Sequence, residues 1–339
     1  MIATEWTATD FRESLQQTNA AIRCSTCRRR QGATCDGRQL ADILQPNPNP
    51  DLCPLKRWSD PRLHVLTTVF NPTGSRRILN NYHRFRASLP PSLPVHVAEV
   101  TFGDAQPEIP ESLWIRANAR NKVWLKERLL NLLLDTLPPT VEKFAWIDAD
   151  VVLTRKGWHE DASEMLNRFD VLQLFDVVHW MNREAKTEME FWGCVRLHQH
   201  PIDGHWGHPG FAWAARRSRL PRFFDADPTG GADTWMADHF RKLRCLAPKS
   251  PGMVTAYDDW RSRTPIQAVG YVPGTVQHLW HGDWTDRRYV KRSAWIAEHN
   301  FDPRTDVRVG ANGLWEWTDT NPELRAKIEA YFPSRKDDG

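Results

Sequence analysis

Residues 144–153 read FAWIDADVVL, an apolar run that two aspartates interrupt. The first four residues, FAWI, are the kind of apolar and aromatic residues that favour a buried strand. Asp148 and Asp150 follow directly, separated by one alanine, before the apolar residues resume. Because burial of an unpaired carboxylate is costly, we expect both aspartates to end the strand and to hold a partner there.

Strand-like and helix-like segments alternate around this stretch. This alternation predicts an α/β fold with a mainly parallel sheet sandwiched by helices, which binds ligands at the carboxyl ends of its strands. Asp148 and Asp150 lie at such an end. The chain from about 176 to 260 is rich in glycine, tryptophan and histidine and is predicted to form loops. The predicted strands cover 63–72, 93–102 and 169–175, and the predicted helices cover about 74–88, 117–138 and 160–168.

The composition is that of an ordinary globular protein of 339 residues with a net charge of +3. This charge is too small to predict a polyanionic partner by itself. Apolar runs stay well below the ~20 residues of a membrane span, and the N-terminus lacks the basic-then-apolar order of a signal peptide. We therefore expect a cytoplasmic protein with no membrane partner.

Two carboxylates at positions i and i+2 of an extended chain point to the same side, where they repel each other unless a cation lies between them. Carboxylate oxygens suit Mg²⁺ or Mn²⁺, and these ions also bind phosphate oxygens. In the alternative interpretation, one aspartate caps the following turn and the other pairs with a basic residue. A D-x-D pattern alone does not decide between them.

In its context, WIDADVV resembles the D-x-D signature of nucleotide-sugar-dependent glycosyltransferases of the GT-A fold, in which the aspartates hold a divalent metal that grips the sugar diphosphate. The resemblance implies a hexosyltransferase that moves a sugar from a UDP-sugar to a hydroxyl acceptor. The TTVFNP turn is similar to the nucleoside cradle of that family, RNKVWLKERLLN to its sugar-nucleotide helix, and HLWHG to its late metal-binding histidine. The nucleotide-sugar contacts are accordingly predicted at Thr68, Phe70, Asn71, Arg120, Lys126 and Asp148, and the Mn²⁺ or Mg²⁺ ligands at Asp148, Asp150, His281 and His278.

The histidines also fit this interpretation by their spacing. His278 and His281 precede a glycine, and on a turn both rings can point to one side. An imidazole beside carboxylates is a reasonable Mn²⁺ site, although a hydrogen-bonded core histidine is the alternative. Downstream, a basic cluster that includes Arg288 could neutralise the leaving diphosphate, or could form a solvated helix face.

Sugar transfer with inversion needs a base that takes the acceptor proton. The segment GGADTWMADHF places Asp233 after two glycines, where the resemblance implies an acidic residue beside the acceptor. Asp233 is our predicted base, and a helix N-cap is the alternative for it. Asp238 would point away if this segment is helical. Trp206, His208 and Trp213 could line the sugar or acceptor pocket, with core packing as the alternative for Trp213. The stereochemistry stays open.

Four cysteines in the pattern C-x2-C-x7-C-x17-C lie in a segment too short and polar to make its own core. Structural Zn²⁺ is the predicted organiser, with an iron–sulfur cluster or free thiols as alternatives. The predicted organisation is a zinc module at 1–62 and a GT-A-like domain at 63–339. The domain would have a nucleotide-sugar-binding half at 63–175 and an acceptor-binding, metal-completing half at 176–339. The predicted zinc ligands are Cys24, Cys27, Cys35 and Cys53.

Arginines surround these cysteines, and a basic zinc knuckle can contact a phosphate backbone, although a flap that only stabilises the fold is the alternative. A GT-A-like domain with a short cysteine module is similar to enzymes of phages and their hosts that glycosylate hydroxymethylated pyrimidines. This resemblance implies 5-hydroxymethylcytosine in DNA as the acceptor, DNA as a partner and a phage-encoded protein in the host cytoplasm. The alternatives are a saccharide or protein acceptor, and a non-catalytic zinc-knuckle nucleic-acid-binding protein.

Overall fold

The computed structural model describes residues 30–31, 34–35, 38–39, 62–205, 207–243 and 249–339. The chain divides into two units, Met1–Asp60 and Pro61–Gly339. In the first unit the described backbone pairs as three short antiparallel strands, β1 (Arg30–Gln31), β2 (Thr34–Cys35) and β3 (Arg38–Gln39). The predicted domain division into 1–62, 63–175 and 176–339 stays a prediction.

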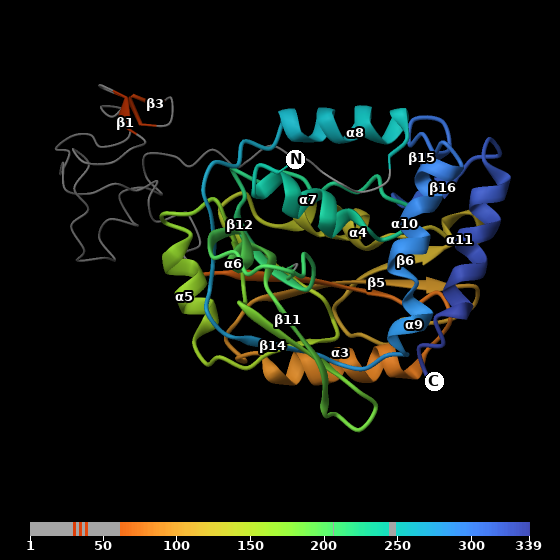
Figure 1. Cartoon of the computed structure of the whole chain (residues 1–339). Coiled ribbons are helices and arrows are strands. Elements are labelled where there is room, and N and C mark those ends of the chain that lie inside the picture. The colour runs from red at the N-terminus through yellow and green to blue at the C-terminus, as the bar shows by residue number, and fades with distance from the viewer. Residues whose placement is uncertain (1–29, 32–33, 36–37, 40–61, 206, 244–248) are drawn as a thin grey trace. The chain divides into compact units, whose positions relative to one another are not determined.

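A seven-stranded sheet forms the centre of the second unit (Figure 1). Its neighbouring strands pair in parallel, except that β12 runs antiparallel between β7 and β9. The strands lie in the order β13 (Val269–Tyr271), β9 (Val171–Gln173), β12 (Ala212–Arg216), β7 (Lys143–Ile147), β4 (His64–Phe70), β5 (Val95–Phe102) and β6 (Leu113–Ala117).

Both faces of this sheet are covered, so its strands are apolar on both sides. In β7, Phe144 and Trp146 point into one hydrophobic cluster, and Ala145 and Ile147 point into the other. In Figure 1, α7 and α8 lie above the sheet and α3 lies below it. The first cluster includes residues of α4 (Lys126–Thr136), α7 (Ala232–Phe240), α8 (Pro251–Ser262) and α11 (Pro322–Ser334), and the second includes residues of α3 (Arg76–Ser88) and α5 (Trp158–Met165). The predicted fold class, a mainly parallel α/β sheet sandwiched by helices, is confirmed.

A second sheet of four strands adjoins the end of β7. Directly after the two aspartates the chain enters β8, which pairs antiparallel with β14. The four strands lie in the order β11 (Thr187–Trp192), β10 (Val177–Met181), β14 (Thr275–His278) and β8 (Val151–Leu153). The remaining elements are η3 (Ala119–Asn121), α6 (Cys194–Gln199), α9 (Trp284–Arg287), α10 (Tyr289–Glu298), β15 (Val307–Val309) and β16 (Trp315–Trp317).

The helix predicted over 117–138 begins only at Lys126. Residues before it form β6 and the single turn η3, because asparagine side chains satisfy the local backbone groups there. The side chain of Asn118 accepts a bond from the backbone of Arg120, and Asn121 accepts one from the backbone of Asn118. The helical spacing of the leucines is therefore real only from Lys126 onward.

The stretch 176–260 is also more regular than predicted, since it contains β10, β11, α6, α7 and α8 in addition to β12. β10 and β11 form a hairpin, while β10 also pairs with β14 and β12 pairs with β7 and β9, partners that local sequence patterns do not reveal. Over the part of the chain that the structure describes, none of the helices has the length and apolar character that crossing a membrane requires.

Candidate functional site

The segment Asp148–Ala149–Asp150 joins the two sheets at the carboxyl end of β7. It forms a turn, in which the Val151 amide donates to the Asp148 carbonyl at 3.2 Å. The Asp148 amide donates to the Phe211 carbonyl at 2.8 Å, and the Asp150 carbonyl accepts from Leu279 at 2.8 Å. Because the chain turns here, the two carboxylates do not point to the same side as the extended-chain argument predicted. Each has its own set of partners.

Asp150 lies with two histidines in a buried cluster. Its Oδ2 is 2.9 Å from His281 Nε2 and 3.7 Å from His278 Nε2, and the two imidazole nitrogens are 3.1 Å apart. His278 ends β14, where it pairs with Val151, the residue after Asp150, so strand register brings the ligand atoms together. One ligand atom from each of the three residues lies within 4.8 Å of the others. The grouping matches three of the four predicted metal ligands.

The cluster has the chemistry of a divalent metal site. Asp150 Oδ1 and His278 Nδ1 are buried without a hydrogen-bond partner among the described residues. Burial lowers the pKa of His278 to about 4, so its ring is neutral at pH 7 and keeps a lone pair. Burial alone would raise the pKa of Asp150, but the neighbouring His281 and His278 hold it well below its usual range. One carboxylate and two imidazoles suit Mn²⁺ better than Mg²⁺, which prefers oxygen ligands.

The last residues of the chain support this cluster from behind. Asp337 Oδ1 is 3.4 Å from His281 Nδ1, 2.9 Å from Arg287 Nη1 and 3.1 Å from Arg335 Nη2. The next residue, Asp338, accepts bonds from the Ser75 hydroxyl and the Arg77 amide, both at 2.8 Å, at the start of α3. The C-terminal segment is therefore fastened to the fold and holds a buried carboxylate behind His281.

We expect the Asp337→Asn variant to lose about 3–5 kcal/mol of unfolding free energy, because two buried guanidinium groups lose their counter-charge. Burial would raise the pKa of Asp337, but the bond from His281 and the charges of Arg335 and Arg287 lower it to about 2. In the unfolded chain the pKa is about 3.9. Stability from ionised Asp337 is thus complete above that value and is lost as the pH falls through about 2.

Urea unfolding at several pH values measures this effect. The stability difference between wild type and the Asp337→Asn variant should shrink as the pH falls from 5 toward 2. Asp258→Asn is the control, since Asp258 belongs to an exposed pair with Arg261 and should change little. A difference that is small, or that stays constant across this pH range, would contradict the role given to Asp337.

Asp148 belongs to a second charged cluster, with Lys126 at its centre. Lys126 Nζ is 2.8 Å from Asp148 Oδ1, 3.0 Å from Asp233 Oδ2 and 3.8 Å from Glu127 Oε1. Burial alone would lower the pKa of Lys126, but these carboxylates raise it well above its usual value. Burial raises the pKa of Asp148 to about 7 and that of Glu127 to about 8, although Lys126 opposes both shifts. The cluster therefore holds one fixed cation beside two carboxyl groups, Asp148 and Glu127, that bind a proton near neutral pH.

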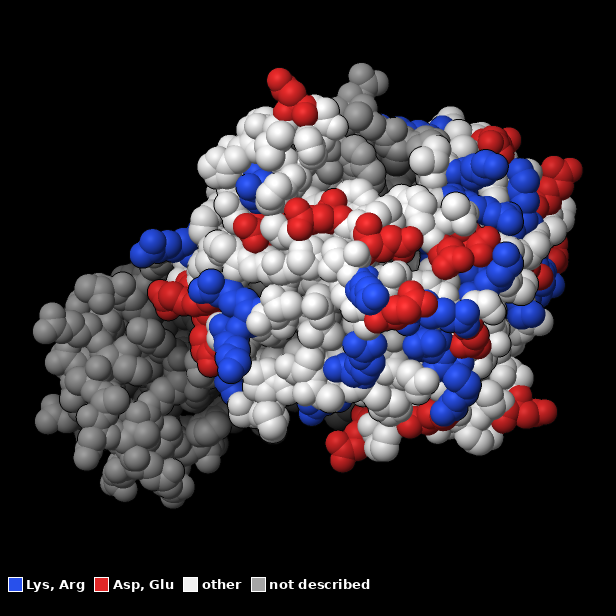
Figure 2. Space-filling view, turned by 60° about the horizontal axis from the view of Figure 1, so that its bottom comes forward, with Lys and Arg blue, Asp and Glu red and all other residues white. Residues whose placement is uncertain are grey.

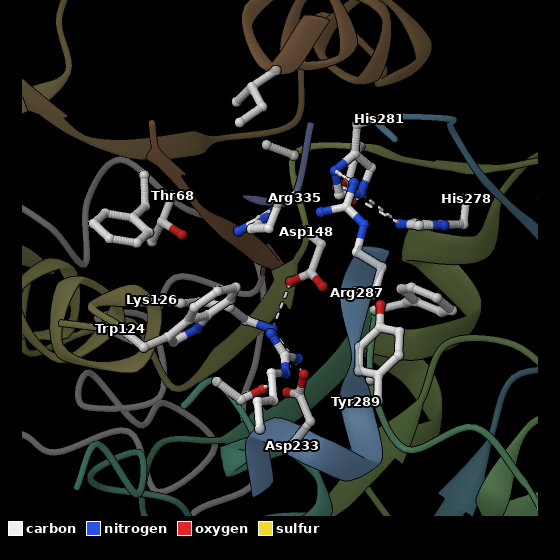
Figure 3. Close-up of a pocket in the computed structure, with 18 of the residues that line it drawn as sticks. Thr68, Trp124, Lys126, Asp148, Asp233, His278, His281, Arg287, Tyr289 and Arg335 are labelled. Atoms are coloured by element: carbon white, nitrogen blue, oxygen red, sulfur yellow. Dashed lines mark hydrogen bonds and ion pairs between the residues drawn. The ribbon is translucent and has the colours of Figure 1, made fainter. Parts of the chain in front are cut away.

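A single pocket contains both clusters (Figure 3). His278 and His281 lie on one side, Thr68 and Trp124 lie on the opposite side, and Lys126 and Asp148 lie between them. The empty volume inside the pocket, which includes space open to solvent, is about 970 Å³. Both clusters therefore face the same space.

The pocket has a cationic and aromatic wall. Arg292 and Arg335 stack on the Trp124 ring, with 5.1 and 5.2 Å from each guanidinium carbon to the ring centroid. Arg287 and Lys126 also line the pocket. The carboxylates of Asp148, Asp150 and Asp233 line the same pocket, so these four cations favour an anionic ligand that binds together with a divalent cation, because guanidinium groups bind phosphate oxygens well.

Other predicted residues lie partly inside and partly outside this pocket. Thr68, Phe70, His208 and Asp233 line it. Asp233 lies in the first turn of α7, whose N-cap is Gly231, so Asp233 is not the cap. Asp238, on the same helix, pairs with Arg241 at 2.7 Å.

Three predicted nucleotide-sugar contacts do not line the pocket, and each has a structural role. The Asn71 side chain bonds the backbone of Ser75 and closes the turn before α3. Arg120 pairs with Asp319 at 2.9 Å. Arg288 has a left-handed backbone between α9 and α10, and its side chain is exposed. Of the predicted aromatic residues, Trp213 is buried in the core, where it stacks on Trp146.

Several predictions fall outside the described residues. Cys24, Cys27 and Cys53, and also Trp206 and Cys245, are among them, and Cys35 is described only as part of β2. The zinc site stays a prediction. Cys194, outside the cysteine segment, is buried.

Sequence reasoning did not assign a role to Trp124, Tyr289, Arg335 or Asp337, of which the first three line the pocket and the fourth supports it. Trp124 lies within the RNKVWLKERLLN stretch, but that resemblance gives it no role of its own, and Tyr289 lies outside the motifs quoted above. The ending SRKDDG has the composition of a solvated tail, and only its packing against α3 and His281 shows otherwise. The only sequence signal for Trp124 and Tyr289 was that they are aromatic, and the sequence contains many tryptophans.

Comparisons with known proteins give distant likenesses only. Protein-family models give no match to this chain, and no characterised protein gives a significant sequence match. Among solved structures, glucosyl-3-phosphoglycerate synthase from Mycobacterium tuberculosis, in complex with Mn²⁺, UDP and phosphoglyceric acid, is 12% identical. That match covers 80% of this chain and 94% of the other, with a TM-score of 0.35.

A 4-diphosphocytidyl-2C-methyl-D-erythritol synthase from Anaerococcus prevotii is 10% identical. It matches over 69% of this chain and 97% of its own length, with a TM-score of 0.34. Likenesses this distant do not show which activity this chain has.

Proposed function

We propose that this protein is a Mn²⁺-dependent glycosyltransferase of the GT-A type that moves a sugar from a UDP-sugar to a hydroxyl group. The observation that carries the proposal is one pocket with three features: the Asp150, His278 and His281 donor set, a cationic wall, and the Asp233 carboxylate on the far side. The donor set alone would also suit Fe²⁺. The arginines and Lys126 favour an ion that binds together with a diphosphate.

Each part of the pocket has a task in this reaction. Transfer breaks the bond between the anomeric carbon and the diphosphate oxygen and forms a bond to the acceptor oxygen. A divalent ion at Asp150, His278 and His281 would supply charge neutralisation for the departing diphosphate. Arg287 and Arg335 add fixed positive charge beside that site, which costs no reorganisation during the reaction.

Asp233 is the base of the proposal. Its bond to Lys126 uses Oδ2, so Oδ1 is available to accept the proton of the acceptor hydroxyl. Lys126 fixes the direction of this carboxylate from the opposite side, and Asp148 shares the same lysine. Lys126 therefore couples the acceptor side of the pocket to the end of β7.

The nucleoside would lie on the side formed by Thr68, Phe70 and Trp124. The Trp124 and Phe70 rings are 5.9 Å apart between centroids and lie edge to face. Arg292, Arg335 and Phe332 already lie against the Trp124 ring. A planar base would therefore contact Phe70, and the hydroxyl of Thr68 can hydrogen-bond a base or ribose.

For the acceptor, 5-hydroxymethylcytosine in DNA is the specific proposal, with a saccharide or protein hydroxyl as the alternative. The support is limited to the basic cysteine segment at 1–62 and the resemblance it carries. On the face of the molecule shown in Figure 2, basic and acidic side chains are interspersed, as the net charge of +3 suggests. A nucleic-acid contact would accordingly depend on local basic residues and not on a field of one sign.

UDP release tests the proposed function. The protein is incubated with Mn²⁺ and a panel of UDP-sugars, together with hydroxymethylcytosine DNA, plain DNA, a simple saccharide or no acceptor. We expect release with at least one UDP-sugar, and we expect a chelator to abolish it. Release that depends on the modified DNA would support the DNA acceptor, and release that depends on the saccharide would contradict it. No release with any nucleotide sugar would contradict the enzyme proposal and favour a non-catalytic protein.

A further inference from the structure

A second cavity opens on the other side of Asp233. The two spaces adjoin, since six of the described residues, the proposed base among them, line both this cavity and the metal pocket: His208, Gly210, Gly230, Asp233, Tyr289 and Arg292. Its empty volume, which includes space open to solvent, is about 1060 Å³. The cavity lies between the beginning of α7 and the helix α10. Anything bound in it would present its nearest atoms to Asp233.

The walls of this cavity are largely apolar. Trp235 is buried at its inner end, and Trp284 and Tyr289 form one side with their ring centroids 5.1 Å apart. Ile296 is also buried, while Val290 stands at the edge with 84% of its surface exposed. Aromatic and aliphatic walls bind planar, apolar groups by area burial and stacking.

The charged groups around the cavity already have partners within the protein. Asp227 accepts bonds from the Thr229 amide at 2.7 Å and from Trp235 Nε1 at 3.0 Å. Arg292 is the only Lys or Arg among the described residues that line the cavity. Its guanidinium lies over the Tyr289 ring at 4.7 Å and donates to the Tyr331 hydroxyl at 2.9 Å. An anionic ligand would meet two aspartates against one guanidinium that is already engaged with Tyr289 and Tyr331, which disfavours it.

A glycine keeps the way to the base open. A Cβ at Gly210 would lie 3.1 Å from Asp233 Oδ2 and 3.2 Å from the His208 ring. A side chain at this position would crowd the carboxylate at the oxygen that Lys126 holds and would displace Asp233 from its position at the cavity. The cavity thus combines an apolar body with one accessible hydrogen-bond acceptor.

Resting on the proposed function, we infer that this cavity is the acceptor subsite and that it takes an uncharged, planar, largely apolar group that carries a hydroxyl, such as an aryl alcohol. Acceptors with a carboxylate or phosphate inside the cavity are excluded by its charge. The hydroxyl points to Asp233, and the ring lies against Trp284, Tyr289 and Ile296. A modified base would satisfy this chemistry if its phosphates stay outside the cavity.

A matched pair of probes tests the inference without turnover. Binding of 4-nitrobenzyl alcohol and of 4-(hydroxymethyl)benzoate is measured by ligand-observed NMR, and Mn²⁺·UDP binding to the wild-type protein is measured separately. We expect the alcohol to bind at least tenfold more tightly than the carboxylate. Ser293 lines the cavity, and the Ser293→Trp variant, with its fold checked by thermal melting, should weaken binding of the alcohol at least tenfold. The matched control is Ala297→Trp, an exposed position on the same helix, which should bind the alcohol as wild type does.

A second variant places a charged residue at the exposed edge of the cavity, where it should not disturb the fold. Because Val290 is exposed, Val290→Arg should shift the preference toward the carboxylate by up to about fivefold, the most that an exposed ion pair supplies. Equal binding of the two probes to the wild type, or binding of the alcohol that Ser293→Trp leaves unchanged, overturns the inference. If the alcohol binds as expected but Mn²⁺·UDP does not, the subsite stands and the glycosyltransferase proposal fails.

Competition with DNA tests whether a nucleobase is the natural ligand of the subsite. The competitor is a duplex that carries hydroxymethylcytosine. Displacement of the nitrobenzyl alcohol by this duplex and not by plain DNA supports a base as the natural occupant of the subsite. Displacement by both duplexes equally contradicts recognition of a hydroxymethyl group in this cavity.

Discussion

Replacing Asp150 with alanine should abolish metal-dependent sugar transfer, with kcat/KM falling at least about 10³-fold. Asp150 supplies the only carboxylate of the three-residue cluster, and its Oδ1 is buried without another partner among the described residues. Loss of the carboxylate ligand leaves two imidazoles, which hold Mn²⁺ weakly. Metal stabilisation of a leaving group is worth several kcal/mol, and each ~1.4 kcal/mol is tenfold in rate. Mn²⁺ binding, measured by electron paramagnetic resonance or calorimetry, should be lost together with activity.

Asp203→Asn is the matched control, since Asp203 is an exposed aspartate that lines neither cavity. It should keep both the metal and the activity. Mn²⁺ binding that survives in the Asp150→Ala variant would show that the ion lies elsewhere, and the argument from the donor set would fail. Unfolding of the variant is monitored by circular dichroism, so that loss of metal is not confused with loss of fold.

Replacing Asp233 with asparagine should lower kcat by about 10² to 10⁴ while Mn²⁺·UDP binding stays within a few-fold of the wild-type value. General-base catalysis contributes a factor of this size, and asparagine keeps the shape of the side chain but cannot take a proton. Lys126 retains its 2.8 Å partner, Asp148, in the variant, so the charge balance on the donor side changes little. The effect should therefore appear in the transfer step, which single-turnover kinetics with saturating UDP-sugar measures.

Asp238→Asn provides the comparison on the same helix. Asp238 pairs with Arg241 away from both cavities, so this change should affect stability more than kcat. If Asp233→Asn and Asp238→Asn lower kcat equally, Asp233 is not the base. If Asp233→Asn instead weakens Mn²⁺·UDP binding as strongly as it lowers kcat, its role would be structural, through Lys126.

Much of the fold follows from local patterns. Two-sided apolar strands such as FAWI, followed by helical spacing, predict a covered, mainly parallel sheet, and the structure has this sheet. The antiparallel direction of β12 inside the sheet was not predicted, because the direction of a strand depends on its distant partners and not on the local pattern AWAAR. The helix at 117–138 was predicted too long, because the apolar spacing was extended to Val123, in a segment that Asn118 and Asn121 hold in another conformation.

For the site, short-range spacing was informative only where the backbone geometry is simple. His278 and His281 are separated by two residues and followed by a glycine. As this spacing predicted, both rings point to one side. The spacing of Asp148 and Asp150 was misleading, because the strand ends at Ile147 and the chain turns. Arg120 and Arg288 are basic residues near the predicted motifs, yet both lie outside the pocket. An ion pair with Asp319 holds Arg120 there, and the left-handed backbone at Arg288 directs that residue away.

Burial and strand propensity depend on neighbouring residues, so the sequence alone predicts a buried strand that ends in two aspartates, and it shows a pair of histidines further along the chain. The partner of each aspartate is known only from the folded structure: His281 for Asp150, and Lys126 for Asp148. It also placed Asp337, from the last residues of the chain, behind the metal cluster. The physical reason is that the partner of a buried charge is set by distances of a few ångströms between segments far apart in the chain, and these distances exist only after the sheets and helices have packed.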